Sequence, residues 1–206
     1  EVFDEYLNTL VEEGRVIKEG EYYYDEELYE SEEIIANFLH KINEYPEEFY
    51  DENELERLLD NYQDKFGIVY STKQKEAIEY FLKYPMMILT GGPGTGKTTI
   101  INGFIETYAR LYQLDLEPDH YNDDVFPILL AAPTGRASRR MNELTGLPAA
   151  TIHRHLGLGQ DEAEDAIGNE LSGSLLIVDE FSMVDTWLAN KLFQAIPGSM
   201  KVLLVG

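Results

Sequence analysis

A glycine-rich segment followed by Lys-Thr-Thr is the feature that most constrains the fold of this 206-residue chain. The run from Leu89 to Thr99 reads LTGGPGTGKTT and contains G-x-x-x-x-G-K-T, the pattern of a phosphate-binding loop. Residues 85–89 before it are apolar throughout, as in a buried strand, and apolar residues recur at helical spacing from 100 to 111. This order of strand, glycine loop and helix predicts a nucleoside triphosphate site.

Each residue type in the loop has a physical reason for its place. Glycines let backbone N–H groups turn toward phosphates at the positive end of a helix. Lys97 is expected to reach the β- and γ-phosphates, Thr98 to hold Mg²⁺, and Thr99 to face the phosphates or cap the helix. The alternative is a glycine turn without a ligand. The predicted ATP-binding residues of the loop are Gly91, Gly92, Pro93, Gly94, Thr95, Gly96, Lys97, Thr98 and Thr99.

The composition describes a globular protein with an acidic surface. No apolar run approaches the roughly 20 residues of a membrane span, no secretory leader opens the sequence, and cysteine is absent. We therefore expect no membrane partner and a cytoplasmic location.

The net charge of −23 argues at first against a nucleic-acid partner. However, residues 1–69 carry 22 acidic and 5 basic side chains, whereas residues 70–206 carry 17 and 11. Four of those later cations fall within 19 residues, so a local basic patch is compatible with the overall charge: Arg136, Arg139, Arg140 and Arg154.

Residues 1–69 are expected to form an acidic, mainly helical accessory domain. A helical pattern stops at Gly14, and short strands flank a turn at Gly20, which could form the wing of a winged-helix unit. Ser31 is expected to cap a second helix. Asp51 and Glu54 fit the capping box of a third helix, which Gly67 ends.

Residues 70–206 alternate between helix and strand, which predicts an α/β fold with a parallel sheet flanked by helices. The acidic stretch 157–174 has no clear periodicity and is interpreted as a mobile surface loop. Because the sequence stops at the end of a strand, where α/β proteins place their active loops, we expect a fragment of a longer protein. The predicted strands are 86–90, 128–132, 175–179 and 201–205.

A second chemical motif is an apolar strand that ends in two carboxylates, Asp179 and Glu180. In a Walker B element of this form, Asp179 would hold Mg²⁺ and Glu180 would align and deprotonate the attacking water. The alternative is a strand that happens to end in acidic turn residues. With the loop lysine, these carboxylates make up the predicted catalytic set: Lys97, Asp179 and Glu180.

Two further segments, 133–140 and 151–155, carry small polar and cationic residues. Residues 133–140 come directly after a strand, so they emerge at the carboxyl edge where ligands bind. Their arginines would pair with phosphates or would simply be solvated on a capped helix. In residues 151–155, Thr151 is a good N-cap and His153 would contact phosphate or satisfy a loop carbonyl.

Gln74 has two explanations. Ser71 and Gln74 form a capping box for the following helix, which needs no ligand, or the amide reads the edge of adenine. Chemistry alone favours the capping role.

Taken together, the motifs resemble those of superfamily 1 helicases of the RecD-like group, the α subunit of exodeoxyribonuclease V and its stand-alone relatives. The similar segments are GGPGTGKTT at 91–99, APTGRASRRM at 132–141, TIHR at 151–154 and LLIVDEFSMVD at 175–185, and residues 22–36 are also similar. The resemblance implies a RecA-like motor domain over 70–206, truncated before the third helicase motif.

The resemblance also implies roles for single residues. Gln74, in STKQKEAI, matches the motif that contacts adenine, and Ser182 and Asp185 would couple the nucleotide site to DNA. The implied partners are single-stranded DNA and other subunits of a repair or recombination complex. The DNA-binding residues that follow from the motifs are Thr134, Gly135, Arg136, Ser138, Arg139, Thr151, His153 and Arg154.

The implied activity is ATP hydrolysis coupled to 5′ to 3′ unwinding in the full protein. The family's γ-phosphate-sensing glutamine and arginine finger have no counterpart in this sequence, so we expect the segment alone to bind Mg-ATP but to turn it over poorly. The alternatives are a P-loop ATPase or kinase that does not act on nucleic acid, and a non-catalytic nucleotide-binding docking module.

Overall fold

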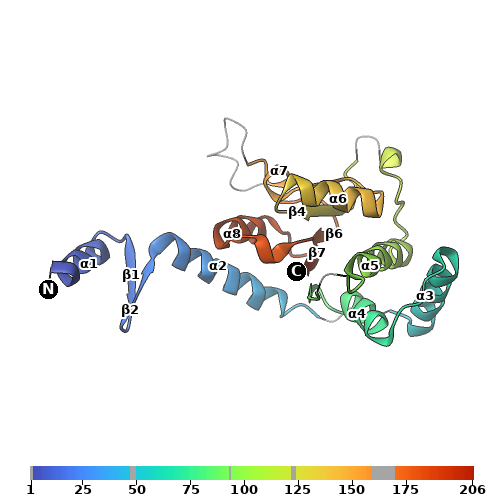
Figure 1. The fold of residues 1–206 in the computed structure, drawn as a ribbon, viewed down its shortest axis with the longest axis horizontal. Helices are drawn as coiled ribbons and strands as arrows, with labels where there is room; N and C mark the ends of the chain where they lie inside the picture. The colour runs from blue at the N-terminus through green and yellow to red at the C-terminus, as the bar shows by residue number, and fades with distance from the viewer. Residues whose placement is uncertain (1, 47–49, 93, 122–123, 159–169) are drawn as a thin grey trace.

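A five-stranded parallel sheet lies at the centre of the computed structural model, in the order β3-β7-β6-β4-β5 (Figure 1). The structure describes residues 2–46, 50–92, 94–121, 124–158 and 170–206. The three inner strands are buried along their whole length, because helices cover both faces of the sheet. The strands are β3 (Met86–Leu89), β4 (Ile128–Ala132), β5 (Ala149–Thr151), β6 (Leu175–Val178) and β7 (Lys201–Val205).

Helices form one layer on each face of this sheet. Alternate residues of β6 show the division, since Leu175 and Ile177 join one apolar core while Leu176 and Val178 join the other. The first core holds side chains of α3 (Glu52–Phe66), α4 (Thr72–Lys83), α5 (Lys97–Leu111) and α6 (Gly135–Thr145). The second holds side chains of α2 (Glu26–Ile42), α7 (Ile152–His155) and α8 (Thr186–Ala195).

The chain begins with α1 (Val2–Glu12) and an antiparallel hairpin of β1 (Val16–Glu19) and β2 (Tyr22–Asp25). Figure 1 shows both at one end of the molecule, beyond α2 and away from the sheet. Of residues 3–30, none is buried. By contrast, α2 packs on α8 and α3 packs on α5. The boundary between a domain 1–69 and a domain 70–206 stays a prediction.

The start of α2 corrects one expectation from the sequence. The helix begins at Glu26, and its N-cap is Asp25, whose side chain accepts the N–H of Leu28. Ser31 is therefore no cap: it lies within the helix, 1% exposed, and its hydroxyl accepts a hydrogen bond from Asn190 of α8. Asp25 precedes two glutamates that favour the first turn, so it provides an earlier start for the same helix.

The predicted strands of the sheet are confirmed to within a residue, and the cap of α3 at Asp51 and its end at Gly67 are confirmed as well. The sequence pattern missed β5, because three residues are too few to show a period. Most of the acidic stretch 157–174 lies outside the described residues. In the parts of the chain that the structure describes, no helix has both the length and the apolarity needed to cross a membrane.

A buried cation ties one edge of the sheet to α4. Lys201, at the start of β7, is 3% exposed, and its ammonium donates to the carbonyl oxygens of Leu82 and Tyr84 at 3.1 and 2.9 Å. These carbonyls lie at the C-terminal end of α4, where the helix dipole favours a positive charge. The last turn of α4 is thereby fixed to the strand that ends beside the glycine loop.

Candidate nucleotide site and the carboxyl edge of the sheet

The strand register brings the predicted motifs to one edge of the sheet. Leu89 of β3 pairs with Val205 of β7, and Leu204 of β7 pairs with Val178 of β6. The glycine loop after β3 and the carboxylates after β6 therefore emerge side by side, with β7 between them. Because neighbouring strands lie roughly 4.8 Å apart, the two motifs start about 10 Å from each other.

The same register extends to the segments predicted to contact DNA. Ala131 of β4 pairs with Val178, and Ala132 pairs with Thr151 at the end of β5. The segments that begin at Thr134 and Thr151 thus leave the sheet at the edge that carries Asp179. The structure places nucleotide motifs on one half of this edge and the predicted DNA segments on the other half.

The glycine loop has the backbone that its sequence predicts. Gly94 and Gly96 have φ angles of 75° and 82°, a left-handed backbone conformation that residues other than glycine rarely adopt. Thr95 closes the turn by donating its hydroxyl hydrogen to the carbonyl of Gly92 at 2.9 Å. Gly91, Gly92 and Thr95 belong to the same loop, and Pro93 lies outside the described residues.

Lys97 is half-buried at the first position of α5, and its ammonium points back into the loop. It donates to the carbonyl oxygen of Gly91 and lies 3.5 Å from that of Gly206. Gly206 in turn accepts the N–H of Gly91, so the loop and the end of β7 share one set of hydrogen bonds. Both acceptors of Lys97 are neutral, and an anionic phosphate oxygen is a stronger acceptor.

The N-terminus of α5 differs from those of the other helices. Its N-cap is Gly96, which provides no side-chain hydrogen bond. Every other α-helix with a described N-cap begins at a side chain that accepts a backbone N–H: Asp25, Asp51, Ser71, Thr134, Thr151 and Asp185. The open N–H groups of α5 fit an anion. Of the two roles expected for Thr99, the helix cap is wrong, since Thr99 lies inside the first turn of α5.

Gln74 combines a capping role with a place beside the loop. Its Oε1 accepts the N–H of Ser71 at 2.9 Å, and its own N–H donates to the hydroxyl of Ser71, so the predicted capping box is confirmed. The amide nitrogen lies against the glycine loop, because a Cβ added to Gly96 would stand 2.9 Å from Nε2. The contact with adenine stays a prediction.

Asp179 and Glu180 lie directly after β6 in an unusual turn. Glu180 has a φ of 54°, in the left-handed region, and its N–H donates to Oδ1 of Asp179 at 2.9 Å. Both side chains are half-buried. Among the described residues no group of three His, Cys, Asp or Glu side chains gathers that could hold a metal ion. The Mg²⁺ contacts of Thr98 and Asp179 stay a prediction.

On α6, two hydroxyls predicted to contact DNA have partners within the protein. Thr134 is the N-cap of α6 and accepts the N–H of Ala137 at 3.2 Å. Ser138 is 5% exposed and donates to the carbonyl of Gly135 at 3.2 Å. Arg136 and Arg139 are exposed on the same helix. The structure thus leaves both arginines and Thr134 exposed, whereas Ser138 is buried.

The second predicted DNA segment divides in a similar way. Thr151 caps α7 by accepting the N–H of Arg154 at 3.2 Å, while His153 is exposed. The histidine that satisfies a carbonyl is His155, which contacts the carbonyl of Leu130 at 2.9 Å. Arg154 lines a cavity of about 500 Å³ with residues that precede β4 and β6, including Phe126 and Glu170.

Sequence reasoning missed Gly206 and gave only a general role to Ser182. Ser182 follows the carboxylates and lies against Gly206, whose added Cβ would stand 3.4 Å from the serine Cβ. Asp185, expected to couple the nucleotide site to DNA, caps α8 by accepting the N–H of Leu188 at 2.8 Å. The spacing of Asp185 before an apolar helix is the signal that would have indicated the cap.

An open helix N-terminus behind a glycine loop, with a lysine in the loop and two carboxylates across β7, defines a P-loop NTPase of the RecA-like α/β fold. Residues 74–206, more than half of the chain, match the family described as AAA domain, and the chain belongs to this family.

The relatives of the chain agree with the motifs. It is 37% identical over 136 residues to the ATP-dependent RecD2 DNA helicase of Deinococcus radiodurans, covering 66% of this chain and 17% of that protein. It is 36% identical over 154 residues to the RecBCD enzyme subunit RecD of Mycolicibacterium smegmatis, covering 65% and 26%. The predicted resemblance to RecD-like proteins is confirmed. The chain spans about a quarter or less of the length of these relatives.

The Pif1 helicase of Candida albicans is a solved structure with a looser likeness. The TM-score is 0.45 and the identity 24%, over 68% of this chain and 32% of that one.

Proposed function

We propose that this chain is the ATP-binding part of a DNA helicase motor, which hydrolyses Mg-ATP and moves along single-stranded DNA in the 5′ to 3′ direction in the full protein. The observation that carries the proposal is the open N-terminus of α5, placed with Lys97 on the sheet edge that also presents Asp179 and Glu180. The names of the RecD relatives support the helicase assignment.

Binding would use groups that are already in place. The N–H groups at the start of α5 would donate to phosphate oxygens, and Lys97 would exchange its bonds to neutral carbonyls for bonds to phosphate oxygens. Thr98 and Asp179 would hold Mg²⁺, and the amide of Gln74, beside Gly96, would contact the base. Mg²⁺ supplies charge neutralisation at the phosphates.

Hydrolysis would use Glu180 as the base. The water oxygen bonds to the γ-phosphorus, the bond from that phosphorus to the bridging oxygen breaks, and a carboxylate oxygen of Glu180 takes the proton of the water. ADP and inorganic phosphate are the products. Further charge stabilisation from outside this segment would be needed, so we expect the isolated segment to turn ATP over slowly.

The DNA track would lie on the other half of the carboxyl edge. Arg136 and Arg139 are exposed and suited to phosphates, as is His153 at the start of α7. Thr134, Gly135, Ser138, Thr151 and Arg154 would support these contacts. Other subunits of a repair or recombination complex are proposed partners, because one relative is named as a subunit of RecBCD. The cytoplasmic location stays a prediction.

The test is ATP hydrolysis by the intact polypeptide that contains this segment, titrated with single-stranded DNA, single-stranded RNA and duplex DNA. Stimulation by single-stranded DNA is the expected result. Hydrolysis that no nucleic acid stimulates would indicate a P-loop ATPase or kinase that acts on other substrates. Nucleotide binding without any hydrolysis would indicate a docking module instead.

A further inference from the structure

The backbone of Glu180 adopts a conformation that needs support. Among the described residues, Glu180 and Gln113 are the only ones other than glycine with a positive φ, and the φ of Glu180 is 54°. L-amino acids adopt this left-handed region at a cost, because the Cβ approaches the neighbouring carbonyl. The contacts on either side of Glu180 therefore determine where its carboxylate stands.

The residue before Glu180 makes a polar contact, and the residue after it makes an aromatic contact. Asp179 accepts the N–H of Glu180 at 2.9 Å. On the other side, the next residue is Phe181, which opens the short 3₁₀ helix Phe181–Met183. The ring of Phe181 lies 5.9 Å from that of Phe193 in α8, with the planes inclined by 44°. The turn is thus anchored into the apolar core under α8.

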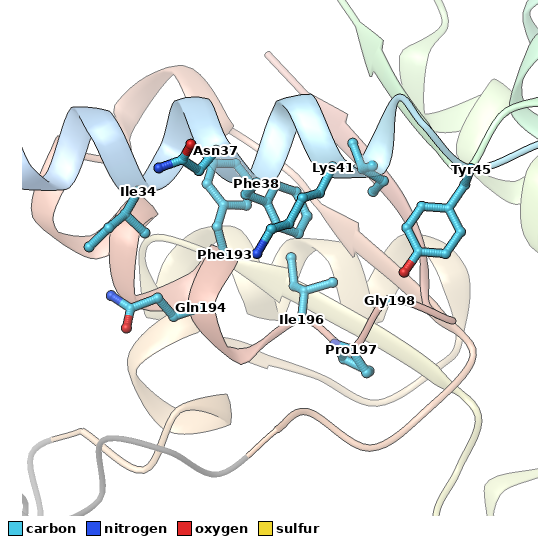
Figure 2. A pocket seen from close by; sticks show the side chains of 11 residues that line it. Ile34, Asn37, Phe38, Lys41, Tyr45, Phe193, Gln194, Ile196, Pro197 and Gly198 are labelled. Atoms are coloured by element: carbon cyan, nitrogen blue, oxygen red, sulfur yellow. The ribbon is translucent and has the colours of Figure 1, made fainter.

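The aromatic contact continues into the N-terminal region. Phe193 is 4% exposed, and its ring stacks on that of Phe38 in α2, with centroids 4.8 Å apart and planes inclined by 12° (Figure 2). A buried hydrogen bond of 2.9 Å from Asn190 to Ser31 fixes the same two helices to each other. Phe38, Phe193 and Phe181, the aromatic stack, therefore join α2 to the turn that carries Glu180.

The stack borders open space. Phe38 and Phe193 line a groove of about 460 Å³ between α2 and α8, closed at one end by Tyr45 over Gly198 (Figure 2). Shortening Phe38 therefore enlarges an existing groove, whereas a change at Phe193 would open a cavity in the core. Phe38 is the member of the stack that is best suited to substitution.

We propose that Phe38 is a positioning residue for hydrolysis: from α2, and through Phe193 and Phe181, it holds Glu180 in the geometry that activates water. The inference rests on the proposed function, in which Glu180 is the base. It extends that function by giving the N-terminal region a part in the chemical step. Loss of the Phe38 ring should lower the rate of hydrolysis at saturating ATP and leave nucleotide affinity unchanged, because the hydrogen bonds described for Lys97 and Thr95 go to backbone carbonyls of Gly91, Gly206 and Gly92 rather than to the aromatic stack.

The experiment measures single-turnover hydrolysis of saturating Mg-ATP, and the binding of a fluorescent ADP analogue, in the intact polypeptide. Phe38→Ala and Phe38→Leu are expected to slow hydrolysis on the order of tenfold, as a small displacement of a catalytic group does. Phe38→Tyr keeps the ring and should restore the rate. Leu39→Ala is the matched control, since Leu39 is the next residue of α2 and is 40% exposed. It should leave hydrolysis unchanged.

A second substitution separates positioning from general destabilisation. In a Glu180→Gln background the base is absent, so adding Phe38→Ala should have no further effect on the residual rate. The proposal is overturned if Phe38→Ala matches Leu39→Ala, if it weakens nucleotide binding in parallel with hydrolysis, or if its full effect persists beside Glu180→Gln. If Glu180→Gln alone hydrolyses ATP normally, Glu180 is not the base, and it is then the proposed function that is wrong rather than the role of Phe38.

Discussion

The helices α5 and α6 start at the same edge of the sheet but treat their first N–H groups in opposite ways. At α6, Thr134 accepts a backbone N–H, so the helix is complete without a ligand. At α5, Gly96 offers no side chain, so the helix end stays open. A binding role is therefore best supported where the protein gives a backbone N–H no partner of its own. The difference also separates the candidate phosphate site from the segments predicted to contact DNA, whose threonines already have structural partners.

The largest effect should come from removing the one cation at the open helix end. Lys97→Ala in the intact polypeptide is expected to lower ATP hydrolysis by at least about a hundredfold, the cost of losing a donor to developing phosphate charge. Lys65→Ala on α3 removes the same charge elsewhere and should leave turnover unchanged. Normal hydrolysis by Lys97→Ala would show that the open N-terminus of α5 is not the nucleotide site.

The next effect tests why the cap of α5 is glycine. Gly96→Ala places a methyl group 2.9 Å from Nε2 of Gln74 in a left-handed backbone, whereas Gly146→Ala at the end of α6 has a similar φ of 72° and open space around it. Both should lower the free energy of unfolding by about 1–2 kcal/mol.

Only Gly96→Ala should also weaken nucleotide binding, on the order of tenfold, because Gln74 and the loop must both shift. Calorimetric titration with ADP, beside thermal unfolding of both variants, makes the measurement. Equal nucleotide affinities for the two variants would show that the cap position of α5 has no special role.

A smaller effect concerns the capping hydroxyl of α6. Thr134→Ala should lower the free energy of unfolding by about 1 kcal/mol, and Thr134→Ser should keep most of it, because serine also caps helices. Urea unfolding measures the stability, and anisotropy of a labelled oligonucleotide measures DNA binding. A Thr134→Ala variant with wild-type stability and much weaker DNA binding would assign the hydroxyl to DNA rather than to the helix.

The smallest effect is the pH dependence of a carboxylate cap. The N–H of Asn53 donates to Asp51, and this holds the pKa of Asp51 below its usual value of 3.8. A carboxylate with a lowered pKa in the folded state adds stability above that usual value, and the stability is lost as the pH falls through the folded pKa. Carboxyl NMR titration should find the low midpoint, and Asp51→Asn should remove this part of the pH dependence.

Patterns with strong local causes were predictable from the sequence. The glycine loop, the capping box of Ser71 and Gln74 and the parallel strands each depend on neighbouring residues, and the structure has all of them. The start of α2 was not predictable in this way, because Asp25 and Ser31 are both good caps; in the structure Asp25 accepts the N–H of Leu28, whereas Ser31 bonds to the distant Asn190.

The candidate site shows the same limit. The residue types at Lys97, Asp179 and Glu180 predicted a chemistry for the site, but not the left-handed backbone of Glu180 or the carbonyl of Gly206 beside Lys97. Both depend on how distant strands come together. Likewise, the sequence could not decide between a capping and a binding role for Gln74. The amide oxygen of Gln74 takes the capping hydrogen bond, and its amide nitrogen stays beside the glycine loop, so one side chain is compatible with both roles.

The hydrogen bond between Ser31 and Asn190 spans 159 residues of sequence, which has a consequence for biosynthesis. At a synthesis rate of about 5–20 residues per second, α2 leaves the ribosome roughly 10–30 seconds before α8 does. During that interval the face of α2 that carries Ile35 and Phe38 has no partner from α8, while its many carboxylates keep the nascent segment hydrated. Because like charges repel, we expect the acidity of the N-terminal region to oppose association of growing chains during that interval.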